Sequence, residues 1–240
     1  MNNSKDLFLN CLDELGLKAT DEQINQFYKF YELLIEKNKV MNLTSITEIQ
    51  DVIIKHFVDS LSIVKIMDLN SIDTLIDVGT GAGFPGVPIK IMFPDIKVVL
   101  MDSLNKRINF LKESCEQIGL HNIYFVHGRA EELGRNVQYR EQFDICVSRA
   151  VANLSTLSEY CLPFVKVGGS FICYKSGDSN EEINAAKNAI DKLSGNIDDR
   201  VDFNLPNSDF SRTLLKIDKI SKMSKKYPRK AGTPSKEPLQ

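Results

Sequence analysis

The feature that most constrains this chain is an alternation that begins near residue 74. Short apolar runs of strand length are separated by segments of helix length, within a chain of 240 residues. This alternation predicts βαβ units and a mostly parallel sheet, because adjacent parallel strands need a crossover between them. We therefore expect an α/β fold. The predicted strands are 74-TLIDVG-79, 97-KVVLMD-102, 123-IYFVHG-128, 143-FDICVS-148, 169-GSFICYK-175, 201-VDFNLP-206 and 212-RTLLKIDKI-220.

The connections between these runs predict how the sheet closes. Helices are expected near 85, over 105–118, 153–163 and 180–194. Only the short polar segment NSDFS separates the last two runs. Such a short link joins antiparallel neighbours. The sequence therefore predicts seven strands, with one antiparallel strand at the sheet edge.

The first 70 residues differ in pattern. Leu7, Phe8 and Cys11 recur at helical spacing, and Thr20 followed by Gln23 is a capping box that starts a second helix. A second capping box is expected at 47-TEIQ-50. We expect three parts: a helical segment at 1–70 packed on the core, a parallel-sheet domain at 71–221, and a basic tail at 222–240.

The turn after the first strand is rich in glycine. Gly79, Gly81 and Gly83 alternate with other residues in 79-GTGAG-83. Glycine permits positive φ and a close approach by a ligand, and ligands bind at the carboxyl ends of strands in such sheets. The loop is therefore the leading candidate for a binding site.

Two ligands compete for this loop. The segment from Gly81 to Gly86 matches G-x-G-x-x-G, the dinucleotide fingerprint. However, the fingerprint should start directly after the strand, at Gly79, and its sixth residue is then Phe84. Pro85 also lacks the amide that a helix N-terminus offers to phosphate. These details favour S-adenosylmethionine over NAD.

Further candidates follow later strands. Asp102 can accept hydrogen bonds from a ribose diol, which both ligands carry. Asp77 either orders the loop or binds the ammonium of the cofactor. Ala130 with Glu131 either lines an adenine pocket or begins a helix. Arg149 is expected at the cleft mouth, where it binds phosphate, stacks on a base or forms a surface ion pair.

The charge is unevenly distributed. From residue 212 onward nine basic side chains face two acidic ones, although the whole chain carries −2. A basic end on an acidic body favours a polyanionic partner, and the alternative is a solvated tail. Lys225, Lys226, Arg229 and Lys230 are the candidate RNA contacts, in a tail expected to close over the cofactor cleft. The residues that can extend the positive rim are Lys106, Arg107, Arg129, Arg135 and Arg140.

Other classes of protein are disfavoured. The amino-terminal residues lack the apolar core of a signal peptide, and no apolar run approaches the roughly 18 residues of a membrane span. Five scattered cysteines and three separated histidines show no metal-ligand spacing. His56 is expected to be a buried, hydrogen-bonded histidine. We expect a cytoplasmic protein without a metal.

Longer segments carry a family resemblance. They are 41-MNLTSI-46, 56-HFVDSL-61, 76-IDVGTGAGFPGVPIKI-91, 100-LMDSLNKRINFL-111, 128-GRAEE-132, 148-SRAVANL-154 and 227-YPRKAGTPSKEPL-239. The chain resembles the bacterial 16S ribosomal RNA guanine-N7 methyltransferase G family, formerly called glucose-inhibited division protein B.

The resemblance implies a class I, Rossmann-like methyltransferase fold with S-adenosylmethionine as the methyl donor. It implies methylation of one guanosine at N7 in the 530 loop of 16S rRNA, presented as free RNA or within a 30S subunit or its precursor. It also implies cofactor contacts at Gly79, Phe84, Ala130, Glu131 and Arg149.

This chemistry needs no general base, because guanine N7 carries a lone pair and loses no proton. Catalysis then consists of holding donor and acceptor in line, about 3 Å apart. The sequence names no catalytic residue. Two alternatives stay open: an NAD-dependent oxidoreductase and a non-catalytic rRNA-binding assembly factor.

Overall fold

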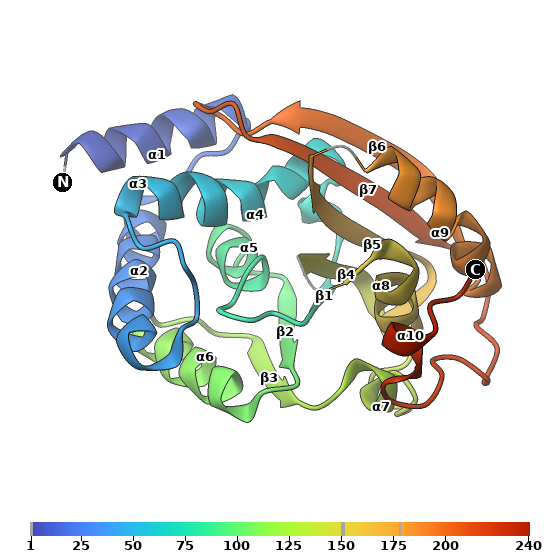
Figure 1. Cartoon of the computed structure of the whole chain (residues 1–240). Helices are drawn as coiled ribbons and strands as arrows, with labels where there is room; N and C mark the ends of the chain where they lie inside the picture. Colours follow the sequence, from blue (N-terminus) through green and yellow to red (C-terminus); the bar gives the residue numbers. More distant parts are fainter. Residues whose placement is uncertain (1, 150–151, 178) are drawn as a thin grey trace.

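A seven-stranded sheet organises the molecule, in the order β3-β2-β1-β4-β5-β7-β6 (Figure 1). The structure, a computed structural model, describes residues 2–149, 152–177 and 179–240. Ala150 and Val151, within the 148–154 motif, therefore lie outside the described residues. The strands are β1 Thr74–Val78, β2 Lys97–Asp102, β3 Ile123–His127, β4 Phe143–Arg149, β5 Val165–Ser176, β6 Gly195–Asn204 and β7 Ser211–Lys219.

All seven predicted strands are confirmed, with one change of position. β7 is antiparallel to both of its neighbours, β5 and β6. The predicted antiparallel strand is therefore correct, but it lies one place in from the edge, and β6 forms the edge. β6 also begins at Gly195, before the predicted Val201. Its first half, NIDDR, is polar and largely exposed, so the apolar pattern could not reveal it.

Both faces of the sheet are buried, and alternate residues of each strand serve opposite faces. Leu75 and Val98 belong to one core cluster, whereas their neighbours Ile76 and Val99 belong to the other. This is the two-residue period of a β-strand. α1 Asn2–Glu14, α2 Asp21–Met41, α5 Gly86–Met92 and α6 Asn105–Gln117 cover the first face. α8 Leu154–Cys161 and α9 Asn180–Lys192 cover the second face.

The amino-terminal helices share the core of the sheet. Phe8, Phe27 and Phe57 are essentially inaccessible, and their ring centroids lie 4.9–6.0 Å apart. Each such burial contributes about 1.5–3 kcal/mol. The capping box predicted at Thr20 and Gln23 is confirmed, and both of its hydrogen bonds are present.

The helical segment at residues 49–65 changes its winding. α3 Ile49–Val52 leads into a π-helical turn at Ile53–Val58, then α4 Asp59–Leu61 and a 3₁₀ turn at Ser62–Lys65. The capping box predicted at Thr47 is wrong, since the residue before the helix is Glu48 and its side chain makes no capping bond. π-turns are often found at functional sites, and this one carries His56 toward the loop after β1, where its ring stacks on Phe84.

The chain after β7 folds back over the second face. It passes α7 Ala130–Leu133 and ends near α8, with a short helix α10 Thr233–Lys236 (Figure 1, red). None of the described helices combines the length and apolarity needed to cross a bilayer. A short 3₁₀ turn also lies at Leu69–Ser71 and another at Leu162–Phe164.

All five cysteines are free and buried. Burial raises the pKa of the Cys115 and Cys173 thiols to about 12. Cys146 and Cys173 belong to the second core cluster.

Candidate functional site

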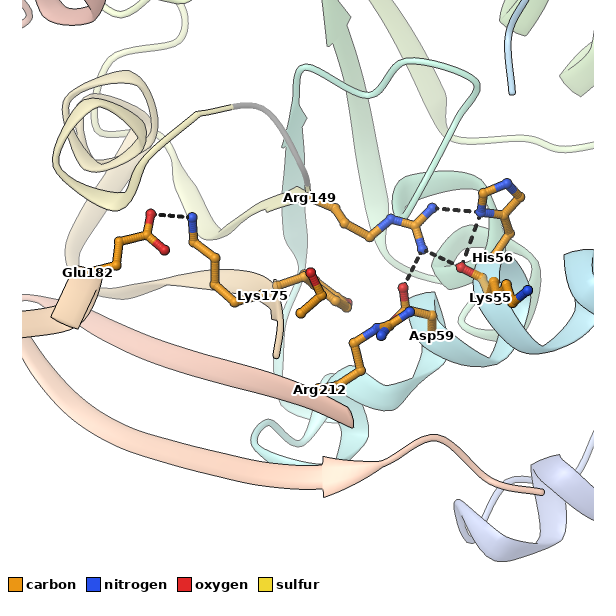
Figure 2. Close-up of a pocket in the computed structure, with 9 residues that line it drawn as sticks. Lys55, His56, Asp59, Arg149, Lys175, Glu182 and Arg212 are labelled. Carbon is orange, nitrogen blue, oxygen red and sulfur yellow. Dashed lines mark hydrogen bonds and ion pairs between the residues drawn. The ribbon is translucent and has the colours of Figure 1, made fainter. Parts of the chain in front are cut away.

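Three adjoining cavities lie where the parallel strands end. The loop cavity, about 400 Å³, lies over the loop after β1 and is lined by residues that include His56, Gly81, Phe84, Asp102 and Arg149. The β3 cavity, about 240 Å³, includes Gly128, Ala130, Glu131 and Tyr160, and it shares Gly79 and Asp102 with the loop cavity. The β5 cavity, about 450 Å³, includes Asp59, Lys175, Glu182 and Arg212, and it shares His56 and Arg149 with the loop cavity (Figure 2). Together they form one row along the end of the sheet.

The loop after β1 has the conformation that its glycines predicted. Gly79 and Gly81 have φ of 74° and 61°, which residues with a Cβ adopt only at a cost. The Gly79 and Thr80 amides donate to the carbonyl of Met101, and the Gly81 amide donates to Oδ2 of Asp102 at 2.9 Å. A Cβ at Gly81 would meet nothing closer than 4.0 Å, so bare backbone faces the cavity there.

Asp77 holds the start of α5 against this loop. Its Oδ2 accepts hydrogen bonds from the Thr80 hydroxyl (2.7 Å) and the Gly86 amide (2.8 Å). The ordering role that the sequence offered for Asp77 is therefore present. Its Oδ1 is buried and has no hydrogen-bond partner among the described residues. Desolvation raises the pKa of Asp77 to about 7, although these two hydrogen bonds oppose the shift.

Two further carboxylates lie at the β3 cavity. Asp102, at the end of β2, accepts hydrogen bonds from the amides of Gly81 and Leu104 and from Nη1 of Arg107 at 3.3 Å. Glu131 is buried, and its Oε1 accepts from Nη2 of Arg129 and from the Gly232 amide. Both carboxylates are thus fixed in place by hydrogen bonds.

Phe84, His56 and Arg149 form a stack between the loop cavity and the β5 cavity. The rings of Phe84 and His56 are 4.5 Å apart and 18° from parallel, and the guanidinium of Arg149 lies 5.2 Å from the Phe84 centroid. Nη2 of Arg149 lies 3.2 Å from Nδ1 of His56. Nδ1 also lies 3.1 Å from the carbonyl oxygen of Lys55, and Nε2 lies 2.9 Å from the Thr44 hydroxyl, so the tautomer of the ring decides which of these contacts are hydrogen bonds.

His56 is neutral in this arrangement. Burial lowers its pKa to about 3, with a further contribution from the charge of Arg149. The predicted histidine is hydrogen-bonded, as expected, but it is half-buried rather than fully buried. Phe84 is at once a buried residue, at 5% exposure, and part of the lining of the loop cavity.

The β5 cavity contains charged groups that the sequence did not single out. The carboxylate of Asp59 binds Nη1 of Arg149 and Nε of Arg212, at 2.8 and 2.9 Å. Lys175 binds Glu182 at 2.7 Å across the cavity (Figure 2). Lys175 lies one residue before the end of β5. Since site residues gather at the ends of parallel strands, this position could have indicated Lys175 as a site residue from the sequence. Arg212 lies near the start of β7. It reaches the end of the sheet where the parallel strands finish because β7 runs antiparallel to β5.

The seven residues predicted to bind cofactor are brought together. Five of them, Gly79, Gly81, Phe84, Asp102 and Arg149, line the loop cavity. Ala130 and Glu131 line the β3 cavity with Gly79 and Asp102. Their binding role stays a prediction.

The tail residues separate into two groups. Lys225, Lys226 and Lys230 are exposed, as an RNA contact requires. Arg229 differs, because its guanidinium binds Glu159 through Nε and Nη2 at 2.7–3.0 Å. Arg140 is half-buried and donates to tail carbonyls, so its expected place on the positive rim is corrected, whereas Arg135 donates to tail carbonyls but stays exposed. Within the described chain no group of three or more histidine, cysteine or acidic side chains could hold a metal ion.

The sheet order, the glycine loop and the acid after β2 define a class I methyltransferase. Solved structures with this fold include a putative methyltransferase in complex with the Haloferax volcanii Trm112 activator (TM-score 0.54, 14% identity, 70% of this chain and 91% of that one). Another is the ribosomal protein L11 methylase from Lactobacillus delbrueckii subsp. bulgaricus (TM-score 0.51, 20% identity, 68% and 77%).

The sequence comparisons identify the family within this class. Residues 23–209 match the model of rRNA small subunit methyltransferase G. The ribosomal RNA small subunit methyltransferase G of Lachnoclostridium phytofermentans is 53% identical over 97% of this chain and 96% of its own length. The protein of that name from Alkaliphilus metalliredigens is 51% identical over 99% of both chains. The chain belongs to this family, and the alternative of an NAD-dependent oxidoreductase is wrong.

The cofactor of this family is S-adenosylmethionine, and the residues present fit it. Asp102 lies between the loop cavity and the β3 cavity, where a carboxylate can accept from ribose hydroxyls. The bare backbone at Gly81 allows close approach, and Pro85 at the start of α5 offers no amide to a phosphate.

Proposed function

We propose that the protein methylates N7 of one guanosine in the 530 loop of 16S rRNA, with S-adenosylmethionine as the methyl donor. The observation that carries this proposal is the continuous row of three cavities. The loop cavity and the β3 cavity suit the donor, whereas the β5 cavity opens beside them and is lined by Lys55, Lys175 and Arg212. A ribosomal substrate would place the protein in the cytoplasm.

The residues of the β5 cavity suit an acceptor that loses no proton. Bound S-adenosylmethionine supplies an electrophilic methyl group. N7 of guanine attacks with its lone pair, so the chain needs to position the purine and manage charge. The methylated purine is cationic, and Asp59 and Glu182 are the carboxylates that line this cavity. His56, neutral and hydrogen-bonded, contributes shape without adding a repelling charge.

Arg149 connects the two halves of the site. Its guanidinium is bound to Asp59, His56 and the Lys55 carbonyl, so it is not free to lie on the acceptor base. It lines both the loop cavity and the β5 cavity. We assign it the role of fixing Phe84 and Asp59 relative to each other, with contact to the donor from the loop side.

An exposed aromatic ring lies beside Lys55, which lines the β5 cavity. Phe210 is 41% exposed, and Nζ of Lys55 lies 4.6 Å from its ring centroid. Single-stranded RNA is recognised by stacking of bases on aromatic rings and by cations at phosphates. We infer that Phe210 stacks on a base next to the target guanosine. The exposed lysines Lys225, Lys226 and Lys230 would bind backbone phosphates.

The test is methyl mapping on rRNA. Ribosomal RNA from a strain that lacks the protein would be incubated with purified enzyme and tritiated S-adenosylmethionine, both as free 16S rRNA and within 30S subunits. We expect one labelled guanosine in the 530 loop that becomes sensitive to cleavage at 7-methylguanosine. Label at another position would reject the assigned site. Tight rRNA binding without any label would support the assembly-factor alternative instead.

A further inference from the structure

The segment after β7 is attached to the rest of the protein by hydrogen bonds from two arginines to its backbone carbonyls. Arg140 donates to the carbonyls of Met223, Ser224 and Tyr227, and Arg135 donates to those of Lys225 and Lys226. Tyr227 is 5% exposed and belongs to the second core cluster. A tail held only by solvated lysines would show none of these contacts, so this segment is a fixed part of the fold.

The strongest attachment is the pair Arg229 and Glu159. Glu159 lies on α8 and its side chain is fully buried, at 0% exposure. It accepts hydrogen bonds from the Arg229 amide at 2.6 Å and from Nε and Nη2 of the guanidinium at 2.7–3.0 Å. Nη2 also donates to the carbonyl of Glu237. A bidentate arginine–carboxylate pair fixes orientation as well as distance, so Arg229 locks the segment onto α8.

The same segment reaches two residues that line the β3 cavity. The Gly232 amide donates to Oε1 of Glu131 at 2.8 Å. Tyr160, which follows Glu159 on α8, lies close to Ser235, whose side chain opposes the larger effect of burial that raises the pKa of Tyr160. The Thr156 hydroxyl donates to the carbonyl of Pro234 at 2.9 Å. Glu131 and Tyr160 therefore contact the cavity on one side and the segment on the other.

We propose that residues 227–237 form a strap that holds the wall of the β3 cavity in the shape that accepts the adenosine end of S-adenosylmethionine, with Arg229 as a positioning residue. This inference rests on the proposed place of the cofactor in the loop cavity and the β3 cavity. The strap touches no donor atom itself. It acts through Glu131 and Tyr160, whose side chains it fixes from behind.

The strap predicts a defect in cofactor binding that is separate from RNA binding. If its loss leaves the wall correctly shaped in about one molecule in ten, the apparent Kd for the donor rises about tenfold. The variant Arg229→Ala should show that rise in calorimetric titration with S-adenosylmethionine in the absence of RNA. Its KM for the donor should rise, while kcat at saturating donor and the Kd for 16S rRNA stay within about twofold of the wild type.

Two further variants define the mechanism. Arg229→Lys should restore little, because lysine cannot form the paired N–H···O contacts with Glu159. Thr156→Val removes the hydrogen bond to Pro234 at nearly constant volume, and it serves if Arg229→Ala does not fold. It should weaken donor binding less than Arg229→Ala, without changing the affinity for RNA.

The matched control lies in the same segment. Replacement of Lys225, Lys226 and Lys230 by alanine removes exposed charges and leaves the anchoring contacts intact, so donor affinity should not change. A folded Arg229→Ala variant with normal donor affinity and weakened RNA binding would overturn the strap in favour of an RNA contact. Absence of donor binding by the wild-type protein would instead refute the cofactor site, and the strap with it.

Discussion

The carboxylate of Asp59 lies 2.8 Å from Nη1 of Arg149, and this ion pair joins the helical segment at 49–65 to the end of β4 (Figure 2). The second oxygen of Asp59 binds Arg212 of β7 at 2.9 Å. One buried anion thus holds two arginines from distant parts of the chain. Because Arg149 also contacts His56 and Phe84, this bridge determines the geometry of the loop cavity as well as that of the β5 cavity.

Asp59→Asn should lower both stability and donor affinity. The amide keeps the size of the side chain but leaves two largely buried arginines without a counter-charge, a change that costs about 3 kcal/mol. Urea unfolding would measure the loss. Asp51→Asn is the matched control, since Asp51 pairs with Lys55 on the same segment but is 47% exposed. It should change stability by less than about 1 kcal/mol. Equal losses in the two variants would show that the bridge has no special role.

Asp77 should make stability depend on pH in a way that Asp77→Asn abolishes. Its folded-state pKa is raised to about 7 by desolvation, above the value of about 4 expected in the unfolded chain. Between these values the folded state binds the proton and the unfolded state does not. The contribution of Asp77 is therefore fully present below pH 4 and is lost as the pH rises to about 7, at about 1.4 kcal/mol per unit of pKa difference.

The measurement compares the two proteins across that window. Free energies of unfolding at pH 5 and pH 8 should differ less in Asp77→Asn than in the wild type, and the wild-type decrease should occur on the alkaline side. If instead the wild-type stability and that of Asp77→Asn change equally between pH 5 and pH 8, Asp77 contributes nothing in this window, and its carboxyl is ionised in the folded protein throughout it.

The sequence predicted those strands whose pattern of apolar residues matches their burial in the structure. The runs at β1, β2 and β4 are apolar because both faces of the sheet are covered, so they were recognisable without any structure. The cofactor candidates were equally recognisable, because Gly79 directly follows β1 and Asp102 ends β2, and such residues gather at one end of a parallel sheet.

The missed features depend on tertiary contacts. Asp59 lies in a helical segment with no local signal for an ion pair, and its partners are 90 and 153 residues away. Arg212 is the second residue of β7, so it reaches the site only because β7 runs antiparallel to β5. Arg229 was grouped with the exposed lysines because a sequence shows its charge but not the buried Glu159 that neutralises it.

Phe210→Ala should weaken RNA binding without affecting donor binding. Stacking of a base on an aromatic side chain contributes about 1–3 kcal/mol, so the Kd for 16S rRNA should rise between about fivefold and 150-fold. Filter binding would measure it. Tyr124→Ala is the control. Tyr124 lies on β3, at the edge of the sheet opposite to β6, and it is 49% exposed with Nζ of Lys97 over its ring. Equal effects of the two changes would remove Phe210 from the RNA surface.

Replacement of Lys225, Lys226 and Lys230 by alanine should flatten the salt dependence of RNA binding. Each lost phosphate contact lowers the slope of log K against log salt by about 0.7, so the three together should lower it by about 2. The matched variant with three arginines should keep the wild-type slope. If the alanine variant has the wild-type affinity at every salt concentration, these lysines do not contact phosphate.

The burial of every cysteine has a practical consequence for such experiments. The five thiols are shielded, and burial keeps the pKa of Cys115 and Cys173 near 12, so little reactive thiolate forms at neutral pH. A single cysteine introduced at exposed Lys225 would therefore accept a maleimide fluorophore selectively, with no need to remove the natural thiols first. Fluorescence anisotropy of that label would report directly whether the end of the chain stays attached during turnover.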